Sequence, residues 1–332
     1  MRMGSIARRG LALTSPLVIA GCAGAQSALA PQGPQAEQLA RLFWIMTAGG
    51  AAVFVIVAIF VAVALYAPAR LRERLADDAM VFAGGVIFPV VTLSALLIYN
   101  FTLLGRGPEA RESGDRIDIR VTGERWWWRV AYVLPDGSRV ETANELRVPV
   151  GRSVDLHLTS ADVIHSFWAP SLAGKLDMFP GRETTMRLVA DKAGVSRGQC
   201  AEYCGGPHAM MAFNVVAMAP GDYMQWLRGQ TETARAPQDA SAGEGQKHFT
   251  TSGCGVCHTI RGTTSVGLLG PDLTHVGSRL AIGAGVLPVD QASIAGWIVD
   301  NQHVKPGNKM PAYATLDAGK VAAISAYLAG LR

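Results

Sequence analysis

A stretch of the chain from Cys200 to Met211 carries side chains that suit copper. Cys200 and Cys204 are four residues apart, and His208 and Met211 follow at intervals of four and three. Thiolate, thioether and imidazole groups are ligands that copper binds well. A single blue-copper ion takes one thiolate, whereas two thiolates can bridge two copper ions, and such a centre needs a second imidazole. His165 can supply that imidazole from an earlier loop.

Simpler interpretations exist for part of this pattern. Cys200 and Cys204 alone would also fit a disulfide or a thiol-based copper chaperone. Neither interpretation accounts for the histidines and the methionine at these spacings. Met210 is the other methionine in the loop; the spacing from His208 favours Met211 as the ligand and Met210 as a packing residue.

A second pattern, Cys254-Gly-Val-Cys257-His258, is typical of covalent attachment of a c-type haem. The two cysteines would form thioether bonds, and His258 would be one axial ligand of the iron. A thioredoxin-like pair is the alternative, but a histidine follows at once and no alternation of strands and helices surrounds the motif.

The other axial ligand is predicted to be Met310, which precedes a proline about fifty residues after His258. Methionine ligation raises the reduction potential of a haem. His275 and His303 are the competing ligands. Gly270-Pro271 is expected to shape the wall of the haem pocket.

The N-terminus has the pattern of a secretion signal. Basic residues precede an apolar run, and Ile-Ala-Gly-Cys22 then resembles a bacterial lipobox, in which the cysteine carries lipid and becomes the new N-terminus. We therefore expect residues 1–22 to be a signal peptide with Cys22 lipidated. The alternative is cleavage by an ordinary signal peptidase after Ala30.

Two windows without charged residues, 42–66 and 79–104, are each long enough to cross a bilayer. The loop between them carries Arg70, Arg72 and Arg74, which places the loop in the cytoplasm by the positive-inside rule. Both large segments would then face the periplasm of a bacterial inner membrane.

The predicted organisation is a membrane hairpin followed by two domains. Two transmembrane helices occupy residues 40–104, and residues 105–228 alternate as short strands of an all-β sandwich or barrel. Residues 229–242 have the composition of a flexible linker. Residues 243–332 are predicted to form a small all-α domain around the haem. The net charge of +4 gives no indication of nucleic-acid binding.

Residues 40–228 resemble cytochrome c oxidase subunit II. The resemblance rests on the copper-type loop, the two spans before it, the Trp126-Trp127-Trp128 cluster and LDMFPGR at 176–182. It implies a cupredoxin fold and a dinuclear copper (CuA) centre. Its ligands would be, in chain order, His165, Cys200, Glu202 through its carbonyl oxygen, Cys204, His208 and Met211.

The resemblance also implies two further roles. In the family the side chain of the glutamate at Glu202 reaches a magnesium ion shared with subunit I. A tryptophan at the position of Trp126 stands where electrons arrive at CuA; the alternative for Trp126 is packing alone. Phe82 stands where many members carry a glutamate at the mouth of a proton channel, which leaves Asp77 and Asp78 as the nearest carboxylates.

The implied function is that of the electron-input subunit of a bacterial terminal oxidase. Electrons would pass from haem c to CuA and on to subunit I, where oxygen is reduced to water and protons are pumped. The expected partners are subunits I and III, the membrane, and a donor such as a cytochrome c or a cytochrome bc complex. The alternatives are the equivalent subunit of a CuA-containing nitric oxide reductase and a periplasmic copper-handling protein.

Overall fold

The computed structural model describes residues 23–104 and 117–332. The chain divides into two compact units, one of residues 37–112 and one formed by the remainder of the chain.

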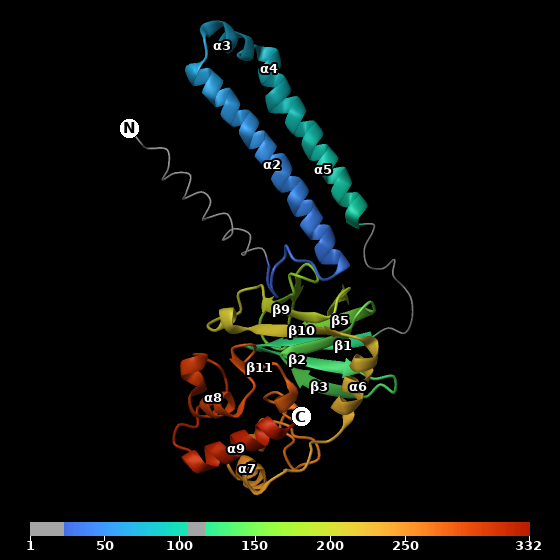
Figure 1. Ribbon diagram of the computed structural model, residues 1–332, viewed down its shortest axis with the longest axis vertical. Helices are drawn as coiled ribbons and strands as arrows, with labels where there is room; N and C mark the ends of the chain where they lie inside the picture. Colours follow the sequence, from blue (N-terminus) through green and yellow to red (C-terminus); the bar gives the residue numbers. More distant parts are fainter. Residues whose placement is uncertain (1–22, 105–116) are drawn as a thin grey trace, which may run out of the picture. The chain divides into compact units, whose positions relative to one another are not determined.

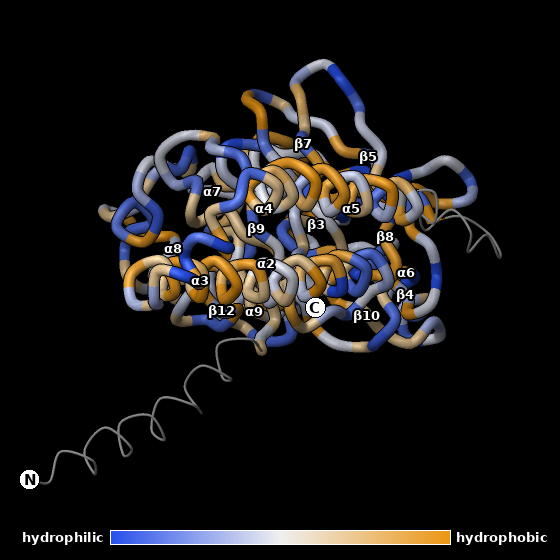
Figure 2. The backbone as a smooth tube through the Cα atoms, turned by 90° about the horizontal axis from the view of Figure 1, so that it is seen from above, coloured by the Kyte–Doolittle hydropathy of each residue, from blue (hydrophilic) through white to orange (hydrophobic). Residues whose placement is uncertain are grey.

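The first unit is a helical hairpin. α2 (Pro34–Tyr66) and α5 (Phe88–Leu104) are joined by two short helices, α3 (Ala69–Leu75) and α4 (Asp78–Phe82), and a π-helical turn (Ala83–Ile87) (Figure 1). Pro34–Tyr66 and Asp78–Leu103 are both long and apolar enough to span a bilayer, and their apolar windows are not buried in protein. Figure 2 shows both as predominantly hydrophobic tubes. The two predicted spans are therefore confirmed as helices.

The wide turn inside the second span has a local cause. Gly84 and Gly85 lie within it, and Pro89 follows closely. Proline lacks a backbone N–H and its ring crowds the preceding turn. The regular α-helical hydrogen bonds are therefore interrupted there and the helix widens locally. Phe82 ends α4 just before this turn.

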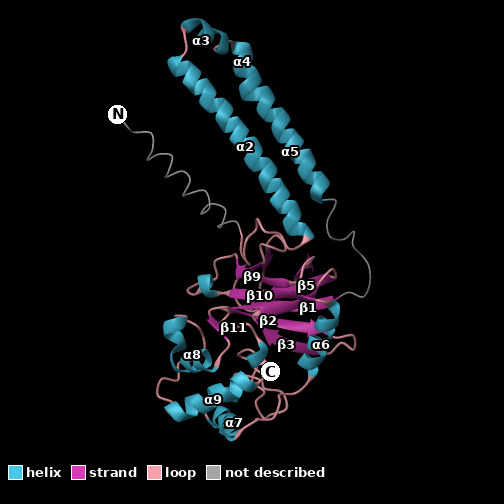
Figure 3. Cartoon of the chain, in the orientation of Figure 1, coloured by secondary structure: helices cyan, strands magenta, loops and turns pink. Residues whose placement is uncertain are grey.

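The second unit begins with a β-sandwich of two five-stranded sheets (Figure 3). One sheet has the order β3-β2-β1-β5-β8 and the other β4-β10-β9-β6-β7. The strands are β1 (Ile117–Glu124), β2 (Trp127–Val133), β3 (Arg139–Ala143), β4 (Glu145–Pro149), β5 (Ser153–Ser160), β6 (His165–Trp168), β7 (Leu176–Met178), β8 (Thr184–Val189), β9 (Gly194–Cys200) and β10 (Ala212–Met218).

The sandwich core follows from alternation along the strands. β1 and β5 pair in parallel, and Ile119, Val121, Leu156 and Leu158 all point inward. They join buried residues of the opposite sheet, such as Leu146, in one core. The predicted all-β domain is confirmed.

A helical domain follows, built on α7 (Ala240–Thr251), α8 (Gln291–Val304) and α9 (Ala318–Gly330). An aspartate caps the start of each helix by accepting a backbone N–H: Asp239, Asp290 and Asp317. α7 and α9 approach closely because Gly245 lacks a side chain; a Cβ there would lie 2.0 Å from the carbonyl oxygen of Ala323. A small hairpin, β11 (Ala281–Ile282) and β12 (Leu287–Pro288), was not expected.

The predicted linker, 229–242, includes the ends of two helices. α6 (Pro220–Thr231) extends into it, and α7 begins at Ala240. The residues between the helices are tied to the helical domain: Ala234 N donates to Arg261 O at 2.9 Å, and a ring nitrogen of His275 donates to Glu232 O at 3.2 Å. Composition could not show these bonds, because their partners lie far along the chain.

Candidate metal centre

Three neighbouring strands position the copper-type side chains. Cys200 ends β9 and pairs with Phe167 of β6, the strand that begins at His165. Met211 immediately precedes β10, which pairs with β9. The loop between Cys200 and Met211 is therefore fixed at both ends, and the sheet brings His165 beside it.

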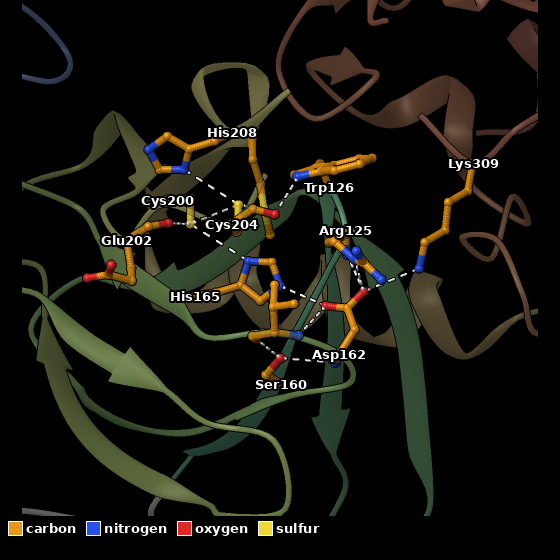
Figure 4. A network of polar contacts seen from close by, with 12 residues as sticks. Arg125, Trp126, Ser160, Asp162, His165, Cys200, Glu202, Cys204, His208 and Lys309 are labelled. Carbon is orange, nitrogen blue, oxygen red and sulfur yellow. Dashed lines mark hydrogen bonds and ion pairs between the residues drawn. The ribbon is translucent and has the colours of Figure 1, made fainter. Parts of the chain in front are cut away.

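The sulfur and nitrogen atoms of this group converge (Figure 4). The two Sγ atoms of Cys200 and Cys204 are 3.8 Å apart. His165 Nδ1 lies 3.8 Å from Cys200 Sγ, and His208 Nδ1 lies 3.5 Å from Cys204 Sγ. Met211 Sδ lies 3.9 Å from Cys204 Sγ. Both imidazoles thus turn the same nitrogen, Nδ1, toward the sulfur pair.

Two further details of the loop match the predicted ligand set. The carbonyl oxygen of Glu202 lies 3.2 Å from Cys200 Sγ, so it faces the site while the Glu202 side chain is partly exposed. Met211 is fully buried, whereas Met210 is 38% exposed. The structure thus brings Met211, and not Met210, to the sulfur pair.

The buried thiols favour a bound cation. The neighbouring thiol of Cys204 lowers the pKa of Cys200 to about 3, and the same pairing raises the pKa of Cys204. Two adjacent sulfurs in a buried site cannot both ionise without a compensating positive charge. Ligand atoms of His165, Cys200 and Cys204 all lie within 4.8 Å of one another. This donor set fits copper ions bound between two thiolates.

Asp162 is a site residue that sequence reasoning missed. Its Oδ1 accepts a hydrogen bond from His165 Nε2 at 3.0 Å. That bond fixes the tautomer of His165 and leaves Nδ1 free for a metal. Burial opposes ionisation of Asp162, yet hydrogen bonds from Arg125 N, His165, Val163 N and Lys309 hold its pKa well below the ordinary value. The only sequence signal was its position three residues before His165.

A glycine also makes room for His165. A Cβ at Gly123, on β1, would lie 2.8 Å from Cδ2 of the His165 ring. The ring therefore packs directly against the backbone of the opposite sheet, and this close approach is not visible in the spacing of ligands.

The three consecutive tryptophans divide between core and site. Trp128 is buried and packs edge-on against Phe167 and Phe213. Trp127 stacks beneath the guanidinium of Arg129, 4.8 Å away. Trp126 turns to the copper-type loop, where its Nε1 donates to Cys204 O at 2.9 Å. Trp128 therefore packs in the core, while Trp126 contacts the copper-type loop.

The cysteine–histidine motif of the helical domain lies in a short 3-10 turn, Cys254–Val256, followed by His258. Nδ1 of His258 donates to Pro271 O at 2.8 Å, which leaves Nε2 available for iron. Gly270 lies against this ring; a Cβ there would come within 2.5 Å of Cε1. Burial lowers the pKa of His258, which favours the neutral imidazole that binds iron. Gly270 and Pro271 thus both lie against the His258 ring, beside the predicted haem site.

Met310 is the only methionine in residues 243–332. Its Sδ accepts a hydrogen bond from Trp297 Nε1 at 3.2 Å. Of the two competing ligands, His275 is held by Glu232 O, and His303 is exposed near the end of α8. Two cysteines, one oriented imidazole and one thioether therefore fit a c-type haem.

Cys22 and the predicted signal peptide, 1–22, lie outside the described residues.

Comparison with known proteins identifies both domains. The family "Cytochrome C oxidase subunit II, periplasmic domain" matches residues 131–218, and the family "Cytochrome c" matches residues 242–332. Cytochrome c oxidase subunit 2 of Alkalihalophilus pseudofirmus is 31% identical, over 100% of this chain and 99% of its own length. The corresponding protein of Bacillus subtilis is 29% identical, over 74% of this chain and 72% of its own length.

Among solved structures, the periplasmic domain of subunit II of the Bradyrhizobium japonicum cytochrome oxidase is similar. It is 31% identical, with a TM-score of 0.34, over 36% of this chain and 96% of that domain. The full-length match, the two domain matches and the two membrane helices agree. The chain belongs to the cytochrome c oxidase subunit II family and carries a cytochrome c domain at its C-terminal end.

Proposed function

We propose that this chain is the electron-input subunit of a terminal oxidase. It takes up electrons in its cytochrome c domain and delivers them to subunit I through the β-sandwich that carries the copper-type loop, here called the copper domain. Bound copper and haem would supply the one-electron chemistry, and the oxygen-reducing, proton-pumping site would lie in subunit I. The observation that carries the proposal is the convergence of two sulfurs and two Nδ1 atoms in one loop and its neighbouring strand.

These contacts support the proposed ligand assignment. The proposed ligands of a dinuclear CuA centre are His165, Cys200, the Glu202 carbonyl, Cys204, His208 and Met211. The partial exposure of the Glu202 side chain is compatible with a second role, at a magnesium ion shared with subunit I. In the cytochrome c domain we assign Cys254 and Cys257 to the thioether bonds, and His258 and Met310 to the iron.

The location and partners of the protein are part of the proposal. Three arginines between the two spans, in and around α3, favour a cytoplasmic hairpin loop and a periplasmic position for both redox domains. Subunit III and an upstream cytochrome donor complete the expected assembly. The relatives named above are oxidase subunits, so we propose oxygen rather than nitric oxide as the final acceptor.

Lipidation of Cys22 gains support from the residues that follow it. Arg197 N of the copper domain donates to Ala25 O at 2.8 Å, and Gln32 N donates to Ser171 O at 2.6 Å. Cleavage after Ala30 would remove Ala25 and its contact with the β-sandwich, whereas cleavage before Cys22 would retain it. We therefore propose Cys22 as the mature N-terminus, which mass spectrometry of the purified chain can test.

The function is tested by replacing one proposed copper ligand in the assembled oxidase. Cys204→Ser should leave the haem reducible by a chemical donor, because the cytochrome c domain keeps all its ligands. It should abolish oxygen consumption, because electrons cannot leave that domain. Ser196→Ala, a change remote from the sulfur pair, is the control and should respire normally. Normal oxygen consumption by Cys204→Ser would contradict the proposal.

A further inference from the structure

A buried lysine lies between the cytochrome c domain and the copper domain. Lys305, which follows α8, is 2% exposed. Its Nζ donates to Trp126 O in the copper domain at 2.6 Å and to Gly283 O in its own domain at 3.0 Å. Burial lowers the pKa of Lys305 to about 7. A buried amine is costly unless it is hydrogen-bonded, so these two carbonyls make a specific seat for it.

Two of the residues that follow Lys305 lie close to the copper-type loop or to the carboxylate beside it. Lys309 Nζ lies 3.2 Å from Asp162 Oδ2, the carboxylate that holds His165 (Figure 4). A Cβ at Gly307 would lie 3.9 Å from Pro207 of the loop itself. The segment 305–309 therefore approaches the copper site at three points, immediately before Met310.

Further hydrogen bonds join the copper domain and the cytochrome c domain, with donors on each side. Ala212 N donates to Ala284 O at 3.1 Å, and Leu280 N donates to Glu145 Oε2 at 2.8 Å. Arginines of the copper domain also donate to haem-domain carbonyls: Arg129 to Leu268, Arg147 to Ser278 and Arg197 to Gly285. Bonds that join backbone atoms of one domain to defined atoms of the other specify a single orientation.

We propose that Lys305 is the positioning residue that seats the cytochrome c domain on the copper domain beside Trp126, so that the two redox domains form one fixed unit. Trp126 is then held from two sides, by Lys305 at its carbonyl oxygen and by Cys204 at its indole nitrogen. A fixed arrangement of the two domains would allow electron transfer without a docking step, and this consequence rests on the proposed function. The position of Lys305 between the domains does not depend on that function.

Hydrogen exchange of the purified full chain tests the seat without reference to activity. The amides of Ala212 and Leu280 donate across the domain boundary. In Lys305→Met they should exchange faster by about tenfold or more, because the docked state is populated less. Amides on the buried face of α9 should be unchanged, and so should all of these amides in the control Lys320→Met, which alters an exposed lysine.

Unchanged exchange at Ala212 and Leu280 in Lys305→Met would overturn the proposal. If the variant unfolds and α9 also loses protection, amine labelling of the wild type decides instead. Lys305 should react with an acylating reagent far more slowly than Lys320, and equal rates would overturn the seat.

The two proposals fail in different ways. If the wild type shows the protected amides but no electron passes between its two domains, the proposed function fails while the seat stands. If electrons pass but the amides of Lys305→Met stay protected, the seat fails while the proposed function stands.

Discussion

The indole nitrogen of Trp126 donates a hydrogen bond to the carbonyl oxygen of Cys204 at 2.9 Å. Cys204, a proposed copper ligand, is thereby joined to Trp126. The backbone carbonyl oxygen of Trp126 in turn accepts a hydrogen bond from Lys305 of the cytochrome c domain. Among the three tryptophans, only Trp126 bonds both to the copper-type loop and to the cytochrome c domain. Trp126 therefore joins a proposed copper ligand to the cytochrome c domain through two hydrogen bonds.

Replacing Trp126 with phenylalanine should slow electron transfer from the cytochrome c domain to the copper domain several-fold. The variant loses the bond to Cys204 O, which is worth about 1 kcal/mol, while retaining an aromatic ring. Laser-flash reduction of the haem followed by absorbance measures the step. Trp127→Phe is the control, because Trp127 contacts Arg129 and not the loop. Equal rates in both variants would support a packing role only.

Asp162→Asn should weaken copper binding by about 10- to 100-fold, the usual cost of losing a carboxylate partner of a metal-binding histidine. The amide can present its NH₂ group to His165 Nε2, so the tautomer with Nδ1 free is no longer enforced. Competition with a copper chelator measures the change. Asp136→Asn, in an exposed turn, is the matched control. Equal affinity in the two variants would remove Asp162 from the site.

Met310→His should lower the reduction potential of the haem, since methionine ligation raises it relative to bis-histidine ligation. The haem should stay attached on a denaturing gel, because Cys254 and Cys257 are untouched. Redox titration followed by visible absorbance measures the potential. His303→Gln should change nothing. A wild-type potential in Met310→His would reassign the axial ligand.

His157 should make stability depend on pH. Its ring lies between Asp118 Oδ1 and Glu183 Oε1, each 2.9 Å away, and the hydrogen bond with Asp118 is the main cause that raises its pKa. This contribution is fully present below the unfolded pKa of about 6.5 and is lost as pH rises through the folded value.

The test of His157 is the difference in thermal unfolding between the wild type and His157→Gln. Because both carboxylates are about two-fifths exposed, the effect should be below about 1 kcal/mol. It should be larger near about pH 6 than near about pH 9. A difference that grows with pH would contradict the arrangement.

Much of the site could be predicted because its ligands are close in sequence. The loop from Cys200 to Met211 carries four proposed side-chain ligands. Their types and spacing in the sequence predict a copper site without knowledge of the fold. His165 was found by the need for a second imidazole; the pairing of β6 with β9 then explains its position. The strand alternation at Ile119 and Val121 likewise specified the sandwich core.

What could not be predicted depends on contacts between distant residues. Asp162, Gly123 and Lys305 have ordinary sequence surroundings. Only the fold brings the first two to His165 and the third to Trp126. The hydrogen bonds made within residues 229–242 could not be predicted for the same reason. A polar stretch is predicted to be flexible unless its hydrogen-bond partners are known, and here they include Arg261 and His275.

The central claim is that the Cys200–Met211 loop and His165 together bind two copper ions. Elemental analysis and electron paramagnetic resonance of the purified full chain test it directly, with the covalent haem as an internal count of chains. We predict two copper ions per haem and seven hyperfine lines, because two bridging thiolates let one unpaired electron spread equally over both nuclei. One copper ion per haem with four lines would contradict the account.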